Sequence, residues 1–153
     1  MGIRTDIRDE IHKETVTKIH GQPTNHDLIN LEKEIISILA NIPTMLGGGN
    51  HGHVGVIMNP TDYNTMTGGT DFVNPVNPGI YPAGLAVNAA AGTRARAEAE
   101  HKELINQFET FEGVRLGTKD LILEAVDNEF LSEIEHDTLG YLNVTPRQMI
   151  GHL

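Results

Sequence analysis

Two histidines separated by one residue have the spacing in this chain that is most suggestive of chemistry. His51 and His53 follow three consecutive glycines in the stretch LGGGNHGHVGVIMNP. Alternate residues of an extended segment lie on one side, so the two imidazoles could bind one metal ion. A competent site needs a third and usually a fourth ligand. Asp62 and His101 are the nearest candidates in the sequence, but their spacing does not indicate that they join the two histidines. We therefore predict no bound metal, with His51 and His53 as the only candidate ligands.

The same stretch also has an architectural interpretation. Glycines permit tight backbone turns, and histidines can hydrogen-bond to neighbouring carbonyl groups. No Gly-Lys-Ser/Thr follows the glycines, and they come after a helical pattern rather than a strand, so they match neither a P-loop nor a dinucleotide-binding fingerprint. We predict a structural motif made of Gly47, Gly48, Gly49, His51, Gly52 and His53.

Catalysis has no positive signal in the sequence. The spacing locates neither a Ser/His/Asp arrangement nor a pair of acid and base carboxylates. The chain has no cysteine, which excludes a thiolate nucleophile, a disulfide framework and a Cys-containing zinc site. We predict that the protein is not an enzyme and carries no cofactor.

Length and charge restrict the function further. A chain of 153 residues suits one domain, and its formal net charge of −10 argues against direct binding of nucleic acid. No window approaches the roughly 20 apolar residues of a membrane span, and the polar N-terminus lacks the continuous apolar stretch of a secretory signal. We expect an intracellular protein that does not enter a membrane.

The hydrophobic periodicity and the capping residues predict an all-α fold. Thr24 and Asp27 form a capping box before apolar residues at helical spacing, and Asn59 and Pro60 have the arrangement that opens a helix. Gly113 is interpreted as the end of the longest helix. We predict helices over 25–40, 60–67, 93–112, 117–126 and 128–136, with a start at 146.

These helices divide the chain into an arm, a domain and a long loop. Residues 1–24 are polar and weakly patterned, which predicts an arm that is partly extended or disordered, before a helical domain at 25–153. The apolar helix faces place the core on Leu31, Ile35, Ile38, Leu104, Phe108, Leu121, Ile122, Val126 and Phe130.

The loop at 70–92 is rich in proline and glycine and has no sustained period. Its apolar side chains alternate with prolines that prevent regular pairing, so they are candidates for contacts between subunits. These assembly candidates are Phe72, Val73, Val76, Ile80 and Tyr81.

Four segments in this order resemble the Gag-like polyprotein of copia-type LTR retrotransposons: LGGGNHGHVGVIMNPTDY, FVNPVNPG, AEAEHKELINQFETFEGVRLGTKDLILEAVDNEFL and NVTPRQMIGHL. The resemblance covers residues 15–153 and is most specific at LGGGNHGH. It implies the N-terminal domain of a capsid, a small bundle of about five helices.

The resemblance also implies a function. Such a domain assembles with itself through hexamer and pentamer contacts into cytoplasmic particles that package the element's RNA. RNA contacts and a C-terminal dimerising domain are expected in other parts of the parent protein. Two alternatives are a metal-dependent binding module or enzyme built on His51 and His53, and a Gag-derived host protein with another role.

Overall fold

The computed structural model describes residues 2–80 and 91–153, and within these residues the fold is all-α, as predicted. Regular structure consists of five α-helices and short 3-10 helices, with one isolated bridge between His136 and Gly140 and no β-strand among the described residues. The α-helices are α1 (Ile3–His12), α2 (Asn25–Leu39), α3 (Pro60–Thr67), α4 (Ala91–Ala125) and α5 (Pro146–His152). The 3-10 helices are Leu46–Gly48, Val54–Val56, Asn128–Phe130 and Ser132–Ile134.

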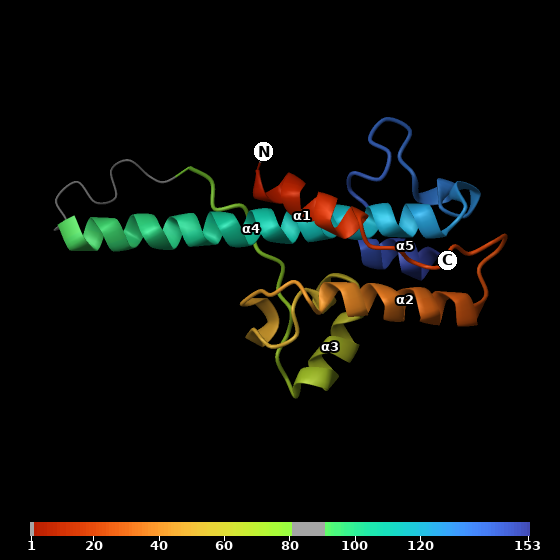
Figure 1. The fold of residues 1–153 in the computed structure, drawn as a ribbon, viewed down its shortest axis with the longest axis horizontal. Coiled ribbons are helices and arrows are strands. Elements are labelled where there is room, and N and C mark those ends of the chain that lie inside the picture. The colour runs from red at the N-terminus through yellow and green to blue at the C-terminus, as the bar shows by residue number, and fades with distance from the viewer. Residues whose placement is uncertain (1, 81–90) are drawn as a thin grey trace.

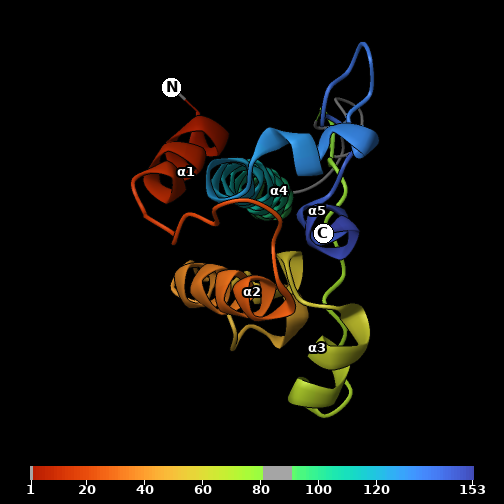
Figure 2. The same ribbon diagram turned by 90° about the vertical axis from the view of Figure 1, so that its right-hand side faces the viewer.

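The long helix α4 is the axis of the molecule. In Figure 1 its C-terminal half lies within the bundle, while its N-terminal half projects well beyond the other helices. Seen along this axis, α1, α2 and α5 surround α4, and α3 lies on the far side of α2 (Figure 2). The core is therefore at the C-terminal half of α4.

The helix starts predicted from capping residues, at 25, 60 and 146, are confirmed. The Thr24 hydroxyl accepts a hydrogen bond from the backbone of Asp27, and the Asp27 carboxylate accepts one from the backbone of Thr24. These hydrogen bonds from Thr24 lower the pKa of Asp27. The side chains of Asn59 and Thr145 likewise cap the first turns of α3 and α5.

Gly113 does not end a helix, so the predicted division into helices at 93–112 and 117–126 is wrong. Gly113 and Gly117 lie one turn apart on the face of α4 that packs against α1. A Cβ atom at Gly113 would lie 2.7 Å from the carbonyl oxygen of Arg4, and one at Gly117 would lie 2.8 Å from the Cβ atom of Ile11. These glycines allow two helices to approach closely, which is a packing role.

The predicted arm is also corrected, because Ile3–His12 forms helix α1. The Arg4 guanidinium donates to both carboxylate oxygens of Glu109 at 2.8 and 3.0 Å, and Arg8 donates to those of Asp120 at 2.7 and 2.9 Å. The hydrogen bonds to Asp120 raise the pKa of Arg8. The stabilising partners of α1 are thus more than a hundred positions away in the sequence, which a local pattern cannot reveal.

The segment after α4 differs from the predicted helix at 128–136. It forms two 3-10 turns and then a hairpin-like loop closed at His136 and Gly140. The buried Lys119 donates a hydrogen bond to the Tyr141 carbonyl and so fixes this loop on α4. Burial, together with nearby cations, lowers the pKa of Lys119 to about 8.

The core contains most of its predicted members. Leu31, Ile35, Leu121, Ile122 and Val126 are buried, and Ile38 and Phe130 pack against them with part of their surface exposed. Phe108 does not join this core, and its partly exposed ring instead lies 5.8 Å from the Arg4 guanidinium carbon. The prediction for Leu104 is wrong, since its side chain is 53% exposed on the projecting side of α4. Residues that the prediction omitted complete the core, among them Ile11, Leu39, Ile57, Tyr63, Phe111, Val114 and Met149.

We expect Gly113→Ala and Gly117→Ala to lower the free energy of unfolding by about 1 to 3 kcal/mol, the usual cost of overpacking a close contact. Gly151→Ala in α5 is the matched control, because nothing lies within 4 Å of its Cβ position. That change should be neutral or stabilising by about 0.5 to 1 kcal/mol, since alanine favours a helix. Urea denaturation measures all three, and equal effects would contradict the packing role.

Candidate functional site

The glycine and histidine stretch forms a loop between α2 and α3, which we call the Gly-His loop (residues 46–58). Its central contact is made by His53, which is completely buried. The His53 backbone N–H donates to the Leu39 carbonyl at 3.0 Å, and Nδ1 lies 2.7 Å from the Ile42 carbonyl oxygen. Carbonyl groups at a helix C-terminus lack partners within the helix. His53 bonds to one of them, that of Leu39, and to the carbonyl of Ile42 in the turn that follows α2. The predicted bonding of a histidine to neighbouring carbonyls is confirmed at this residue.

Two glycines of the loop, Gly47 and Gly52, lie where a side chain has no room. Gly52 has a φ of +57°, and a Cβ atom there would lie 2.6 Å from the carbonyl oxygens of both Leu39 and Ala40. Gly47 has a φ of +61°, and its Cβ position overlaps the ring of Tyr63, whose hydroxyl donates to the Gly47 carbonyl at 2.6 Å. Gly48 and Gly49 also have positive φ. The loop can therefore lie against α2 and Tyr63 only with glycine at positions 47 and 52.

The His53 ring is held neutral by its surroundings. Because Nδ1 must carry the proton that it donates to the Ile42 carbonyl, Nε2 presents a lone pair. Nε2 is buried and has no hydrogen-bond partner. Burial lowers the pKa of His53, against the smaller opposing effect of the Ile42 hydrogen bond.

His51 has a different environment from His53. Its ring is half-buried and packs edge-on against Tyr63, with the ring centroids 6.2 Å apart. Within residues 2–80 and 91–153, no three His, Cys, Asp or Glu side chains lie close enough together to hold a metal ion. Neither Asp62 nor His101 therefore completes a site with the two candidate ligands.

Phe72 joins the Gly-His loop to α4. Its ring packs edge-on against Tyr63 with centroids 5.6 Å apart, and it lies 6.4 Å from the ring of Phe111 on α4. Gly55 lies directly against the Phe72 ring, where a Cβ atom would overlap it. Phe72, an assembly candidate from the sequence, thus packs within its own domain.

The other described assembly candidates are exposed. Val73, Val76 and Ile80 are 68%, 86% and 94% exposed, and Tyr81 lies outside the described residues. A groove of about 420 Å³ is lined by the chain from Val73 to Pro78 together with Leu46, Leu104 and Gln107. His101 lies 3.1 Å from the Gly79 carbonyl oxygen and brings the end of this segment to α4.

A second groove of about 320 Å³ lies beside the first, and Gln107 lines both. The other lining residues include Pro43 and Met45 of the loop after α2, and Asn106 and Thr110 of α4. Met45 and Leu104 are both more than half exposed. Exposed apolar side chains therefore gather where α4 leaves the bundle. We call Met45, Val73, Val76, Ile80 and Leu104 the apolar surface. Sequence periodicity assigned Leu104 to the core and gave no role to Met45.

No known family model, curated protein or solved structure matches the chain. In the part of the chain that the structure describes, no helix is both long enough and apolar enough to span a membrane.

We expect Gly47→Ala and Gly52→Ala to lower the free energy of unfolding by about 2 to 4 kcal/mol. Left-handed backbone strain accounts for about 1 to 2 kcal/mol, and steric overlap adds the remainder. Gly68→Ala separates the two causes, because Gly68 has a φ of +74° with nothing within 4 Å of its Cβ position. Thermal and urea unfolding measure the loss of unfolding free energy in each variant. An equal loss in all three variants would rule out the steric contribution.

Stability should fall in acid because of His53. Its folded pKa is lower than the ordinary value of 6.5, so its contribution is complete above that value and is lost as the pH falls below it. The slope from one proton is at most about 1.4 kcal/mol per pH unit. His53→Gln keeps a donor but does not titrate. The difference in unfolding free energy between the wild type and His53→Gln should therefore shrink as the pH is lowered from 7.5 to 5. A difference that stays constant over this range would contradict a neutral buried ring.

Proposed function

We propose that this chain is a structural protein, a Gag-like capsid domain that associates with copies of itself to form a particle shell. The observation that carries the proposal is the apolar surface, where large exposed side chains from the 43–49 loop, the 73–80 segment and α4 meet. Monomeric proteins rarely leave such a patch uncovered, and a second copy would bury it. The resemblance to copia-type Gag proteins supports the same role.

The way that the apolar surface is built supports a role in recognition. Phe72 is anchored between Tyr63 and Phe111, so the residues that follow it are held at the surface. Pro75 and Pro78 restrict that segment, which lowers the entropy lost when a partner orders it. The exposed positions of Val73 and Val76 are therefore set before any partner binds.

The wider function follows from the same proposal. Hexamer and pentamer contacts would close the shell in the cytoplasm, and the element's RNA would be bound by other parts of the parent protein. The net charge of −10 makes copies repel one another, so the association should strengthen as salt screens that repulsion. In this proposal the domain has no catalytic role.

A metal-dependent module or enzyme built on His51 and His53 has less support. The Nδ1 atom of His53 is used in the hydrogen bond to Ile42, and its Nε2 atom is enclosed. A metal ion could reach Nε2 only if the Gly-His loop left α2.

We expect Val76→Asp with Leu104→Asp to weaken self-association by about tenfold or more, because charged groups would have to be buried at the contact. Both residues are exposed, so the fold should survive, as circular dichroism would verify. Ile29→Asp with Met66→Asp is the matched control, with the same charge change at exposed apolar residues of α2 and α3. Sedimentation velocity over a range of concentrations measures the association, and a normal result for the first variant would refute the apolar surface as the contact.

A further inference from the structure

The exposed segment after α3 contains a short repeat, because VNP at 73–75 occurs again at 76–78. We call residues 73–78 the VNP segment. Proline fixes its own φ, and a residue before proline favours extended backbone, so four of the six residues favour the polyproline II conformation. This conformation has three residues per turn and rises about 3.1 Å per residue. It places Val73 and Val76 on one side of the segment, about 9 Å apart.

The VNP segment has unused hydrogen-bonding groups. Among the described residues, no hydrogen bond involves the backbone from Val73 to Pro78. The segment is fixed beyond its two ends, where Phe72 packs on Tyr63 and where the Gly79 carbonyl oxygen lies 3.1 Å from His101. Its backbone groups and its two exposed valines are therefore presented to a partner.

The groove of about 320 Å³ that Gln107 and Met45 line, which we call the α4 groove, has matching chemistry. Its polar lining comes from α4 and includes Asn106, Gln107 and Thr110. Within the described part of the chain, these three side chains make no hydrogen bond. A side-chain amide carries both a donor and an acceptor, so it can bond the N–H and carbonyl groups of an extended backbone. Met45 adds an exposed apolar side chain.

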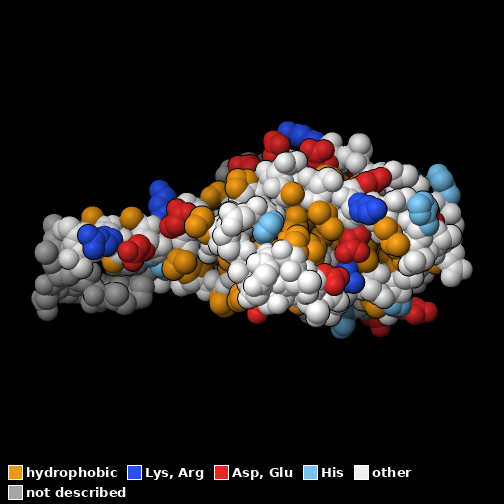
Figure 3. All heavy atoms as spheres, turned by 90° about the horizontal axis from the view of Figure 1, so that it is seen from below, with side chains coloured by type: hydrophobic (Ala, Val, Ile, Leu, Met, Phe, Trp, Pro, Cys, Tyr) orange, Lys and Arg blue, Asp and Glu red, His pale blue; other side chains and the backbone are white. Residues whose placement is uncertain are grey.

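The dimensions of the VNP segment and the α4 groove also match. The lining on α4 runs from Glu103 to Thr110, which spans about 10 Å at a rise of about 1.5 Å per residue. This length is close to the separation of the two valines in an extended segment. Figure 3 shows hydrophobic side chains along the projection of α4 and on the adjoining bundle, beside acidic and basic ones.

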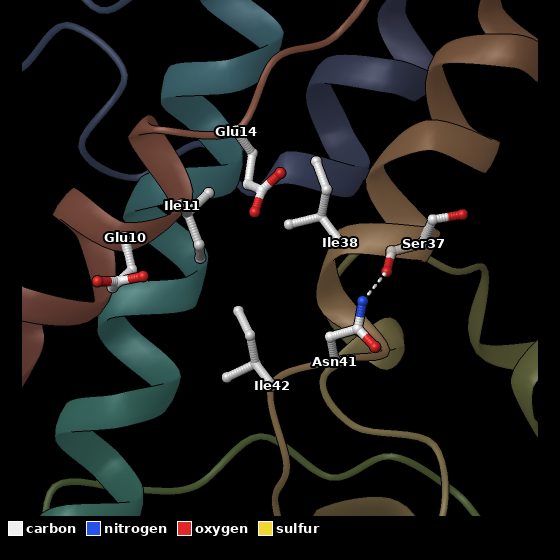
Figure 4. A pocket seen from close by; sticks show the side chains of 7 residues that line it. All are labelled: Glu10, Ile11, Glu14, Ser37, Ile38, Asn41 and Ile42. Atoms are coloured by element: carbon white, nitrogen blue, oxygen red, sulfur yellow. Dashed lines mark hydrogen bonds between the residues drawn. The ribbon is translucent and has the colours of Figure 1, made fainter.

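The pocket between α1 and α2 lacks this combination (Figure 4). It has a volume of about 370 Å³ and an apolar lining that includes Ile11, Ile38 and Ile42. The amide nitrogen of Asn41, which also lines it, already donates to the Ser37 carbonyl at 3.0 Å, as the dashed line shows. This pocket therefore serves as a comparison site on the same molecule.

We propose that the VNP segment of one copy binds in the α4 groove of a second copy. Val73 and Val76 pack on Met45, and the backbone of the segment bonds to the amides of Asn106 and Gln107. The inference rests on the proposed self-association and specifies its contact. A second copy is the occupant because the chain itself presents an exposed segment of matching length and chemistry beside the groove.

The arrangement gives the contact a twofold symmetry. Gln107 lines both the α4 groove and the neighbouring groove beside the VNP segment. In an isologous contact both copies use the same patch, so each segment covers the groove of its partner. The twofold axis then passes near Gln107, which lies between segment and groove. Such a contact closes on itself and joins copies in pairs.

Filling the α4 groove tests the proposal. Asn106→Arg places a long side chain in the groove and should weaken self-association by about tenfold in sedimentation velocity. Ser37→Arg is the matched control, since Ser37 is exposed in the comparison pocket and the charge change is the same. Both changes make the net charge less negative, which by itself favours association, so a loss cannot come from general repulsion. Circular dichroism verifies the fold, and normal association of a folded Asn106→Arg would overturn the proposal.

A second measurement does not depend on filling the groove. The chain has no cysteine, so one introduced cysteine per copy can link only different copies. A short bismaleimide should link Val76→Cys to Asn106→Cys far more efficiently than Val76→Cys to Ser37→Cys. A tag that changes the mass of one preparation separates the mixed product from links between identical variants. Equal yields of the two mixed products would overturn the proposal.

The outcomes separate this inference from the proposed function. If Asn106→Arg associates normally while Val76→Asp with Leu104→Asp does not, the groove contact is wrong and the apolar surface stands. If the wild-type chain does not associate and the cysteine variants do not cross-link, both are wrong.

Discussion

The turn that follows α2 must be held against the loop that returns to it, and the rest of the structure depends on how His53 bonds to the carbonyl groups of Leu39 and Ile42. One residue provides two donors, its backbone N–H to Leu39 and its ring to Ile42. To place His53 there, the loop must pass close to the backbone at the end of α2. Gly52 permits this approach because it has no side chain. The buried lone pair on Nε2 is the energetic cost of using an imidazole in this position.

From this anchor the packing continues outward through aromatic rings. Tyr63 bonds to the Gly47 carbonyl and contacts Phe72, and Phe72 in turn reaches Phe111 on α4. The loop after α2, the segment after α3 and the long helix are thus linked by one continuous set of contacts. The same set determines which side chains stay outside, because anchoring Phe72 leaves Val73 and Val76 at the surface.

The sequence predicted those features that local chemistry determines. The capping boxes at Thr24 and Thr145 and the Asn59 cap gave correct helix starts, because each depends on residues within one turn. Gly113 was misread because a glycine after an amphipathic run resembles a helix end, whereas its role depends on α1, which lies far away in the sequence. Helix α1 itself was missed for the same reason, since Arg4 and Arg8 find their partners on α4. Nothing local distinguishes the buried His53 from His51, or Phe72 from Val73, so the details of the site required the fold.

The length of α4 has a mechanical consequence. A helix rises about 1.5 Å per residue, so the stretch from Gly113 to Ala91 is about 33 Å long. With its fulcrum where Gly113 and Gly117 lie against α1, this half of the helix is a rigid lever, and a tilt of about 10° moves its tip by about 6 Å. A small change in the angle between α1 and α4 would therefore displace the far end of α4 much more than the end packed on α1. In the proposed shell, such a tilt would let identical subunits fit surfaces of different curvature.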